Sequence, residues 1–243
     1  MTNADSRRGL DLYLGSDLGG WALDHLPLAA VRQVITLDEA LAAQAAAAGL
    51  VVHLGDANAL VLDTSPVALS VHYPKILRPP LLGRYQRAYN IHPGYLPWGR
   101  GYYPVFWALW EGTPAGATLH EMAPAVDAGP IVAQIQVTYS ERDTGGSLFA
   151  RVRAAEQRLL SEYWPRICAG EPLPSAPQPA GGTTHLRREF FELKRAVSLP
   201  GMTAEHLVRL ARCLTFPGHT GLELVLGGQR WELRLEPLHD PPA

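Results

Sequence analysis

Short apolar runs alternate with amphipathic segments over the first 170 residues of the chain. Runs of strand length lie at 10–16, 34–36, 50–54, 67–71, 88–92, 116–122 and 131–139. Continuous apolar runs of this kind are typical of strands buried on both faces, so they predict a largely parallel sheet. The intervening segments predict helices at 21–26, 38–48, 79–85 and 104–110. The alternation predicts an α/β domain with an open sheet.

A further helix is predicted after Asp143 and Thr144. Apolar residues recur there at steps of three and four, which predicts one buried stripe along the helix. The stripe consists of Leu148, Val152, Ala155, Leu159, Tyr163 and Ile167.

The chain changes character after this helix. Residues 171–182 are rich in proline and end in two glycines, a composition typical of a linker. Residues 204–214 predict a helix capped by Thr203, and two apolar runs around Gly227-Gly228 predict a β-hairpin. We therefore expect a main domain at 1–170, a linker at 171–182 and a small α+β subdomain at 183–243.

The composition and net charge of the chain argue against a nucleic acid polymer as its partner. The chain has 243 residues, 47% apolar and 18% charged, with a net charge of −2. This balance lacks the basic excess typical of proteins that bind nucleic acid polymers. Two cysteines without a CxxC motif predict neither a zinc site nor a disulfide framework. No secretory signal is recognisable and no apolar run reaches the roughly 18 residues of a membrane span, so we expect a cytoplasmic protein.

A glycine-rich turn follows the first predicted strand, at residues 15–20 (Gly-Ser-Asp-Leu-Gly-Gly). Its spacing differs from the G-x-G-x-x-G of dinucleotide-binding proteins, and no acidic residue follows the second strand in the expected place. The pattern favours a plain tight turn over a nicotinamide site.

Candidate chemistry lies where the strand at 88–92 runs into a Pro/Gly loop. Asn90 and His92 are separated by one residue, so both side chains lie on the same face of the strand. Asp127 follows 35 residues after His92. An amide donor, a proton-transferring imidazole and an orienting carboxylate suit acyl transfer, and open α/β sheets place chemistry at strand ends. Each residue alone is also compatible with a turn or a packing role.

A longer pattern surrounds these three residues. Residues 90–112, 115–122 and 126–131 resemble the signature of formyltransferases that use 10-formyltetrahydrofolate, a family that includes methionyl-tRNA, glycinamide ribonucleotide and sugar N-formyltransferases. Residues 70–77 and 143–148 also resemble that family. The resemblance implies a Rossmann-like formyltransferase fold, N10-formyltetrahydrofolate as co-substrate and no metal. It also implies that Asn90, His92 and Asp127 are catalytic.

The tail is similar to the region that follows the catalytic domain in sugar N-formyltransferases. The similarity lies in residues 182–190, 203–207 and 214–219, with Thr184 where those enzymes usually have tyrosine. Methionyl-tRNA enzymes carry a larger, basic C-terminal domain instead. The resemblance thus implies a nucleotide-linked amino sugar as the acceptor. An amino acid or hydroxylamine-type metabolite of a siderophore or antibiotic pathway, a formyltetrahydrofolate hydrolase and a non-catalytic folate- or sugar-binding module stay open as alternatives.

The resemblance also implies where the substrates bind. The folate is expected against Ile76, Leu77, Ala123, Val126 and Asp127. The acceptor amine is expected over the aromatic and basic residues Tyr95, Trp98, Arg100, Tyr102 and Tyr103, although these rings could instead pack the loop against the next helix.

His120 and the C-terminal hairpin give two further expectations. His120 lies in the strand that precedes the Asp127 loop, where it can support the site without touching substrate. The C-terminal hairpin offers an exposed strand edge, which favours pairing with a second subunit in a homodimer.

Overall fold

The computed structural model describes residues 9–195 and 201–236. Contacts within the chain divide it into two compact units. The first contains Met1–His92, Ala117–Ile135 and Ala155–Pro179, and the second contains Pro93–Gly116, Gln136–Ala154 and Ala180–Ala243.

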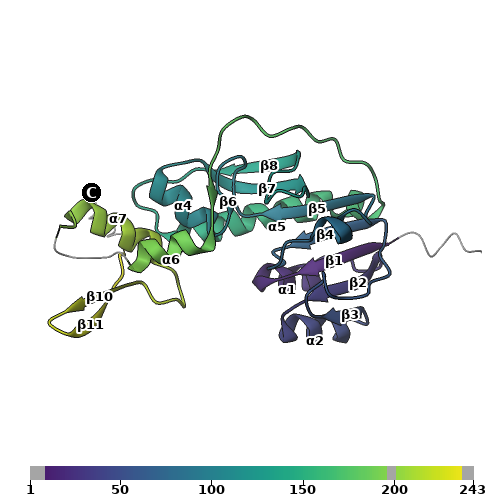
Figure 1. The fold of residues 1–243 in the computed structure, drawn as a ribbon, viewed down its shortest axis with the longest axis horizontal. Coiled ribbons are helices and arrows are strands. Elements are labelled where there is room, and N and C mark those ends of the chain that lie inside the picture. Colours follow the sequence, from purple (N-terminus) through teal and green to yellow (C-terminus); the bar gives the residue numbers. More distant parts are fainter. Residues whose placement is uncertain (1–8, 196–200, 237–243) are drawn as a thin grey trace, which may run out of the picture. The chain divides into compact units, whose positions relative to one another are not determined.

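A seven-stranded sheet, most of which belongs to the first unit, has the strand order β3-β2-β1-β4-β5-β7-β8 (Figure 1). Its strands are β1 (Leu10–Leu14), β2 (Val31–Thr36), β3 (Val51–Leu54), β4 (Val67–Val71), β5 (Arg87–His92), β7 (Ala115–Glu121) and β8 (Ile131–Val137). The strands β1 to β5 pair in parallel, whereas β7 pairs antiparallel with β5. The prediction of an open, mostly parallel sheet is confirmed.

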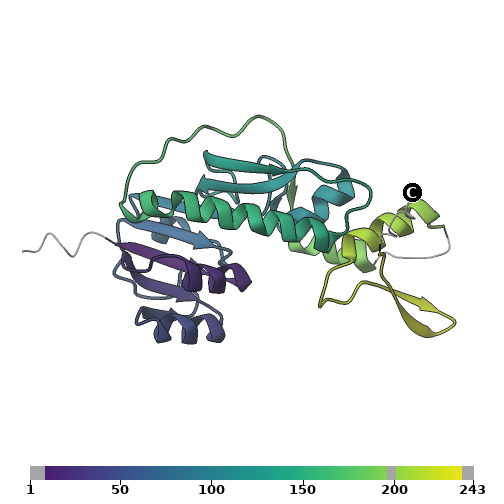
Figure 2. The same cartoon turned by 180° about the vertical axis from the view of Figure 1, so that it is seen from behind.

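The helices are α1 (Ser16–His25), α2 (Glu39–Ala47), α3 (Pro79–Leu82), α4 (Pro104–Glu111), α5 (Gly145–Cys168), α6 (Arg187–Arg195) and α7 (Ala204–Leu214). In the view of Figure 2, α1 and α5 lie in front of strands of the sheet. The α1 helix begins five residues before its predicted start. Gly19, read from the sequence as part of a turn, lies inside α1, and a methyl group added there would lie 3.2 Å from the Leu14 side chain. A small residue is therefore used for close packing of the helix on β1.

The direction of strand progression reverses between β1 and β4. From β1 the chain proceeds to β2 and β3 on one side, and from β4 to β5 on the other. The Gly15 N–H donates to the Val71 carbonyl oxygen at 2.9 Å, which joins the ends of these two strands. Ser16 and His72, the next residues on each chain segment, both have a φ of 56°. In open α/β sheets such a switch point forms a crevice in which ligands bind.

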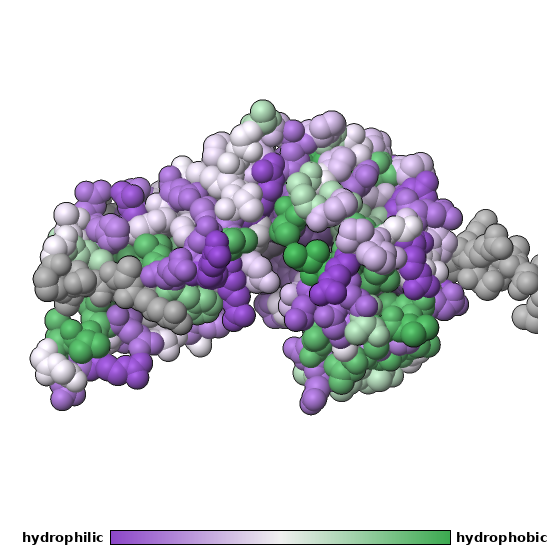
Figure 3. Space-filling model, viewed as in Figure 1, coloured by the Kyte–Doolittle hydropathy of each residue, from purple (hydrophilic) through white to green (hydrophobic). Residues whose placement is uncertain are grey.

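The edge strand β3 of the first unit carries exposed apolar side chains. Val51 is 58% and Leu54 is 51% exposed, and Figure 3 shows apolar residues gathered over the region of α2 and β3. Within the described part of the chain, none of the helices has the length and apolarity needed to cross a membrane.

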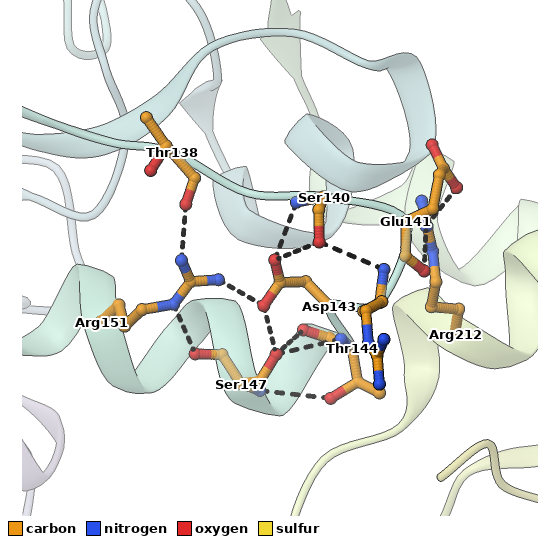
Figure 4. A network of polar contacts seen from close by, with 9 residues as sticks. Thr138, Ser140, Glu141, Asp143, Thr144, Ser147, Arg151 and Arg212 are labelled. Atoms are coloured by element: carbon orange, nitrogen blue, oxygen red, sulfur yellow. Dashed lines mark hydrogen bonds and ion pairs between the residues drawn. The ribbon is translucent and has the colours of Figure 1, made fainter. Parts of the chain in front are cut away.

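In the second unit, a polar network fixes the first turn of α5 (Figure 4). The Asp143 carboxylate accepts hydrogen bonds from the Ser140 N–H at 2.8 Å and the Ser147 hydroxyl at 2.8 Å, and it pairs with Arg151. Burial alone would raise the pKa of Asp143, but these hydrogen bonds outweigh burial and lower it. Thr144, the residue directly before the helix, accepts a hydrogen bond from the Ser147 N–H at 3.2 Å and so caps the first turn.

The core of the second unit joins α4, α7, the first turns of α5 and the C-terminal hairpin. The hairpin consists of β10 (Leu222–Leu226) and β11 (Gln229–Leu233), joined by Gly227-Gly228 with both φ angles positive. The predicted hairpin and its turn are thus confirmed.

A short strand pair that the sequence did not predict ties the tail to the loop after His92. The strand β6 (Arg100–Gly101) pairs in parallel with β9 (Thr184–His185). A methyl group added at Gly182 would lie 2.1 Å from the Pro97 carbonyl oxygen, so only glycine allows this approach. Ala176, which lies in the predicted linker at 171–182, forms an isolated antiparallel β-bridge with Ile131.

Candidate active site

Cross-strand pairing builds one wall of a polar site at the carboxyl end of β5. Asn90 lies directly opposite His120 of β7, and His92 lies opposite Thr118. Asn90 and His92 share a face because they are two residues apart on one strand. His92 is 4% and His120 is 2% exposed. The sheet therefore holds both imidazoles in place by burial.

The position of His120 fixes the orientation of the Asn90 amide. His120 Nδ1 lies 2.7 Å from the Glu121 carbonyl oxygen, which can only accept, so Nδ1 carries the proton. In the neutral ring Nε2 is then an acceptor, and it lies 3.1 Å from Asn90 Nδ2. One N–H of Asn90 is thereby committed to His120, and the second N–H of the same nitrogen can donate to a ligand.

Asp127 enters the site from the loop between β7 and β8. Its oxygens lie 3.6 Å from His92 Nδ1 and 3.6 Å from His120 Nε2. The φ of Asp127 is 49°, a left-handed conformation that Asp tolerates better than most residues. The structure thus brings together Asn90, His92 and Asp127, as the sequence predicted, and adds His120 between two of them.

The Asp127 loop is held by a residue that sequence reasoning missed. Gln178 Nε2 donates to the Asp127 carbonyl at 2.7 Å and to the Gly129 carbonyl at 2.8 Å. Gly129 itself packs against β7, because a methyl group there would lie 1.8 Å from the Glu121 carbonyl oxygen. Gln178 lies in the predicted linker, where proline-rich composition gave no signal of such a contact.

This arrangement can stabilise a negative oxygen and move a proton. The Asn90 amide supplies an uncharged donor, and one such donor is typically worth about 3–4 kcal/mol to a transition state. His92 directs Nδ1 toward Asp127, so its Nε2 points away from the carboxylate. An imidazole oriented by a carboxylate in this way is suited to acid–base chemistry.

The residues predicted to contact folate also belong to the first unit. Leu77 is buried in an apolar cluster with Tyr13, and Met122 packs against that cluster. The segments that contain Ile76 and Ala123 therefore adjoin the same core. Ile76 is 58% exposed and Val126 is 39% exposed, so both offer apolar surface to a ligand.

The residues predicted to contact the acceptor belong to the second unit. Tyr102 is exposed, whereas the Tyr103 ring packs on Phe190 of α6 with a centroid distance of 4.4 Å. Tyr95 and Trp98 form a turn, with the Trp98 N–H 3.0 Å from the Tyr95 carbonyl, and the Arg100 N–H donates to the Thr183 carbonyl at 3.0 Å. Tyr103 thus has a packing contact with α6, a later helix than the one considered from the sequence.

Metal ligands are not clustered in the described ranges, 9–195 and 201–236, where no group of three His, Cys, Asp or Glu side chains is arranged to hold an ion.

Comparison with known proteins identifies the family. Residues 42–163 match the family model described as formyl transferase. The chain belongs to the formyl transferase family. The match includes Asn90, His92 and Asp127, together with the segments expected to contact folate.

Individual proteins that resemble this chain are also formyltransferases. A dTDP-4-amino-4,6-dideoxyglucose formyltransferase of Mycobacterium tuberculosis is 32% identical over 129 residues, which cover 53% of this chain and 55% of that protein. The chain thus spans about half the length of the curated relatives it matches.

Solved structures extend the likeness to the rest of the fold. The formyltransferase PseJ from Anoxybacillus kamchatkensis, crystallised with UDP-4,6-dideoxy-4-formamido-L-AltNAc and tetrahydrofolate, is 28% identical. The superposition covers 79% of this chain and 93% of that one, with a TM-score of 0.60. A sugar N-formyltransferase from a Shewanella species is 19% identical and covers 96% of this chain and 99% of that one, with a TM-score of 0.81, which shows a shared fold.

Proposed function

We propose that this protein transfers the formyl group of N10-formyltetrahydrofolate to the amine of a nucleotide-linked amino sugar. The observation that carries the proposal is the convergence of Asn90, His92 and Asp127 at the end of β5. Family membership supports the reaction type, and the relatives named as acting on nucleotide sugars support the acceptor.

The residues have distinct roles in the proposed reaction. When bound, the folate supplies a formyl group on a nitrogen leaving group. Asn90 donates its second N–H to the oxygen that becomes negative as the amine attacks. His92 moves a proton between the attacking amine and the leaving nitrogen, and Asp127 orients the His92 ring and stabilises its protonated form. His120 holds the Asn90 amide in the donating orientation.

The surroundings of the site fit a folate. A pterin ring is flat and largely apolar on its faces, and exposed Ile76 and Val126 would cover such faces. We propose Ile76, Leu77, Ala123, Val126 and Asp127 as the folate contacts. For the acceptor, we propose stacking on Tyr95, Trp98 and Tyr102 and a charged contact from Arg100; Tyr103 supports this surface through α6.

The test is an assay of the purified full chain with N10-formyltetrahydrofolate and a panel of nucleotide-linked amino sugars, scored by tetrahydrofolate release and product mass. Asn90→Ala should lower kcat/KM by about 10²–10³-fold, the effect of losing one oxyanion donor. His92→Asn should lower kcat/KM by at least the same factor. His25→Asn is the matched control, because His25 is an exposed histidine whose Nδ1 lies 2.9 Å from the Trp21 carbonyl oxygen.

The outcomes separate the alternatives. Full activity in both site variants would refute the assignment. Steady folate release without any amine would indicate a hydrolase. Formylation of amino acids or hydroxylamines in preference to sugars would replace the acceptor class but keep the reaction.

We also propose that the protein is a homodimer joined through its C-terminal hairpin. Leu222, Leu224 and Leu233 of the hairpin pack on the core of the second unit, but Trp231 and Leu226 on the same face are 58% and 47% exposed. Burial of these side chains against a second copy would remove apolar surface from water. A monomer mass by light scattering at micromolar concentration, unchanged by Trp231→Glu, would contradict the proposal.

The cytoplasm is the proposed location. Both cysteines are free thiols, as is usual in a reducing compartment.

A further inference from the structure

A second polar cluster lies at the switch point between β1 and β4, outside the formyl-transfer residues. Ser16 Oγ lies 3.1 Å from His72 Nδ1, and His72 Nε2 lies 2.5 Å from Glu156 Oε1. Ser16 begins α1, His72 follows β4 and Glu156 lies in the middle of α5. We propose that Ser16 is a serine nucleophile, activated by His72 and Glu156, that hydrolyses small acyl esters.

The carboxylate determines which nitrogen of His72 carries the proton. The Glu156 side chain is fully buried, and in the proposed relay it is ionised, so its carboxylate only accepts hydrogen bonds. His72 Nε2 must therefore donate to Glu156, and in the neutral ring Nδ1 is left as an acceptor. The Ser16 hydroxyl accordingly donates its proton to Nδ1, which is the arrangement of a nucleophile beside its general base.

The backbone presents Ser16 at the edge of the sheet. Ser16 is exposed, whereas the His72 side chain is 15% and the Glu156 side chain 0% exposed. The base and its orienting carboxylate thus lie beneath an accessible hydroxyl. Ser16 has a φ of 56° in a sharp strand-to-helix turn, and turns of this kind present the nucleophile of α/β-hydrolases.

Helix capping alone does not account for the cluster. The Leu18 N–H lies 3.4 Å from Ser16 Oγ, a contact that a capping serine would also make. Capping requires neither a histidine base on the other side of the hydroxyl nor a buried carboxylate behind that base. In the proposed reaction, the N-terminal N–H groups and positive end of the ten-residue α1 stabilise the oxygen that becomes negative.

The reaction consumes an ester and one water. Ser16 Oγ bonds to the ester carbonyl carbon while its proton passes to His72 Nδ1. The carbon–oxygen bond to the alcohol then breaks, and the alcohol leaves with that proton. Water attacks the acyl-serine, giving a proton to His72 that returns to Ser16 Oγ as the carboxylic acid is released.

A fluorophosphonate probe tests the proposal on the full chain. The wild type should gain one adduct by intact mass, and peptide mapping should place it on Ser16. Ser16→Ala should gain none. Ser161→Ala is the matched control and should label like the wild type, because Ser161 is also exposed and its hydroxyl donates to the Gln157 carbonyl at 2.9 Å.

The relay makes a separate prediction about rates. His72→Gln and Glu156→Gln should each slow labelling, and the hydrolysis of 4-nitrophenyl acetate, at least tenfold, with thermal melting used to confirm folding. An adduct elsewhere than Ser16 in the wild type, or no adduct, would overturn the proposal without reference to any variant. Equal labelling rates in folded His72→Gln and wild type would overturn the relay.

Discussion

Replacement of Gln178 by leucine should impair catalysis through the Asp127 loop. The Gln178 amide bridges the carbonyl oxygens of Asp127 and Gly129 at 2.7 and 2.8 Å. Leucine has nearly the same volume but no donor, so both contacts are lost while the space stays filled. The loop then loses the bridge that holds its backbone near the histidines.

The magnitude follows from those two hydrogen bonds. A hydrogen bond contributes about 0.5–1.5 kcal/mol net, so the pair should be worth about 2 kcal/mol of stability. For a chain of this size, that loss lowers the melting temperature by about 4–8 °C. The catalytic effect should be larger, because a displacement of about 1 Å at a reacting group can cost about 10²-fold in rate.

Three measurements check this reasoning: kcat/KM in the formyl-transfer assay, the melting temperature, and hydrogen exchange of the peptide that contains Asp127. The exchange measurement is independent of the assigned reaction. Gln86→Leu is the control, since Gln86 is an exposed glutamine of the same unit. If Gln178→Leu kept wild-type exchange in the loop and full activity, other contacts would hold the loop and Gln178 would have no part in catalysis.

Other predictions concern single, separable features. Gly129→Ala should abolish formyl transfer, since its methyl group would meet the Glu121 carbonyl at 1.8 Å and displace the Asp127 loop; kcat/KM and melting temperature check this. Asp143→Asn should cost about 1 kcal/mol at neutral pH in urea unfolding, because a neutral amide weakens the hydrogen bonds of this side chain and its pairing with Arg151. Because folding lowers the pKa of Asp143, this stabilisation is present above the unfolded value of about 3.9 and is lost as the pH falls through the folded value. Burial raises the pKa of the Cys213 thiol to about 12, so thiol reagents should modify it only in denaturant, as mass spectrometry can show.

Local sequence patterns predicted the helices and strands that are specified by residues close together in the chain. The strand at 67–71 and the helix at 204–214 have the bounds that their apolar patterns predict, and Thr203 caps the helix as expected. The predicted start of α1 was wrong because Gly19, which reads as part of a turn, serves there for close packing on β1. The β6–β9 pair was missed because two residues in each strand carry no periodic signal.

In the candidate site, too, local features were predicted from the sequence, whereas contacts between distant residues were not. The spacing of Asn90 and His92 reveals a shared face without any knowledge of the fold. The contact of Asn90 with His120 depends on the register of an antiparallel pair, and Gln178 reaches Asp127 across 51 residues of sequence. Ser16 and Glu156 are likewise brought to His72 from 56 and 84 residues away. Such contacts arise from topology and have no local pattern in the sequence.

Two histidine–carboxylate pairs at successive strand ends differ in a way that bears on their chemistry. His72 is bonded tightly to Glu156 at 2.5 Å, so its tautomer is fixed before any substrate arrives. His92 and Asp127 stand 3.6 Å apart, beyond ordinary hydrogen-bond length. Catalytic hydrogen bonds often shorten only in the substrate complex, and the carboxylate here lies on a loop while the histidine lies on a strand. Tightening of the site on binding is therefore expected to proceed by movement of Asp127 toward a fixed His92. The Gln178 bridge keeps the backbone of that loop near the histidines, within reach of this movement, which is why its loss should affect the rate more than the stability.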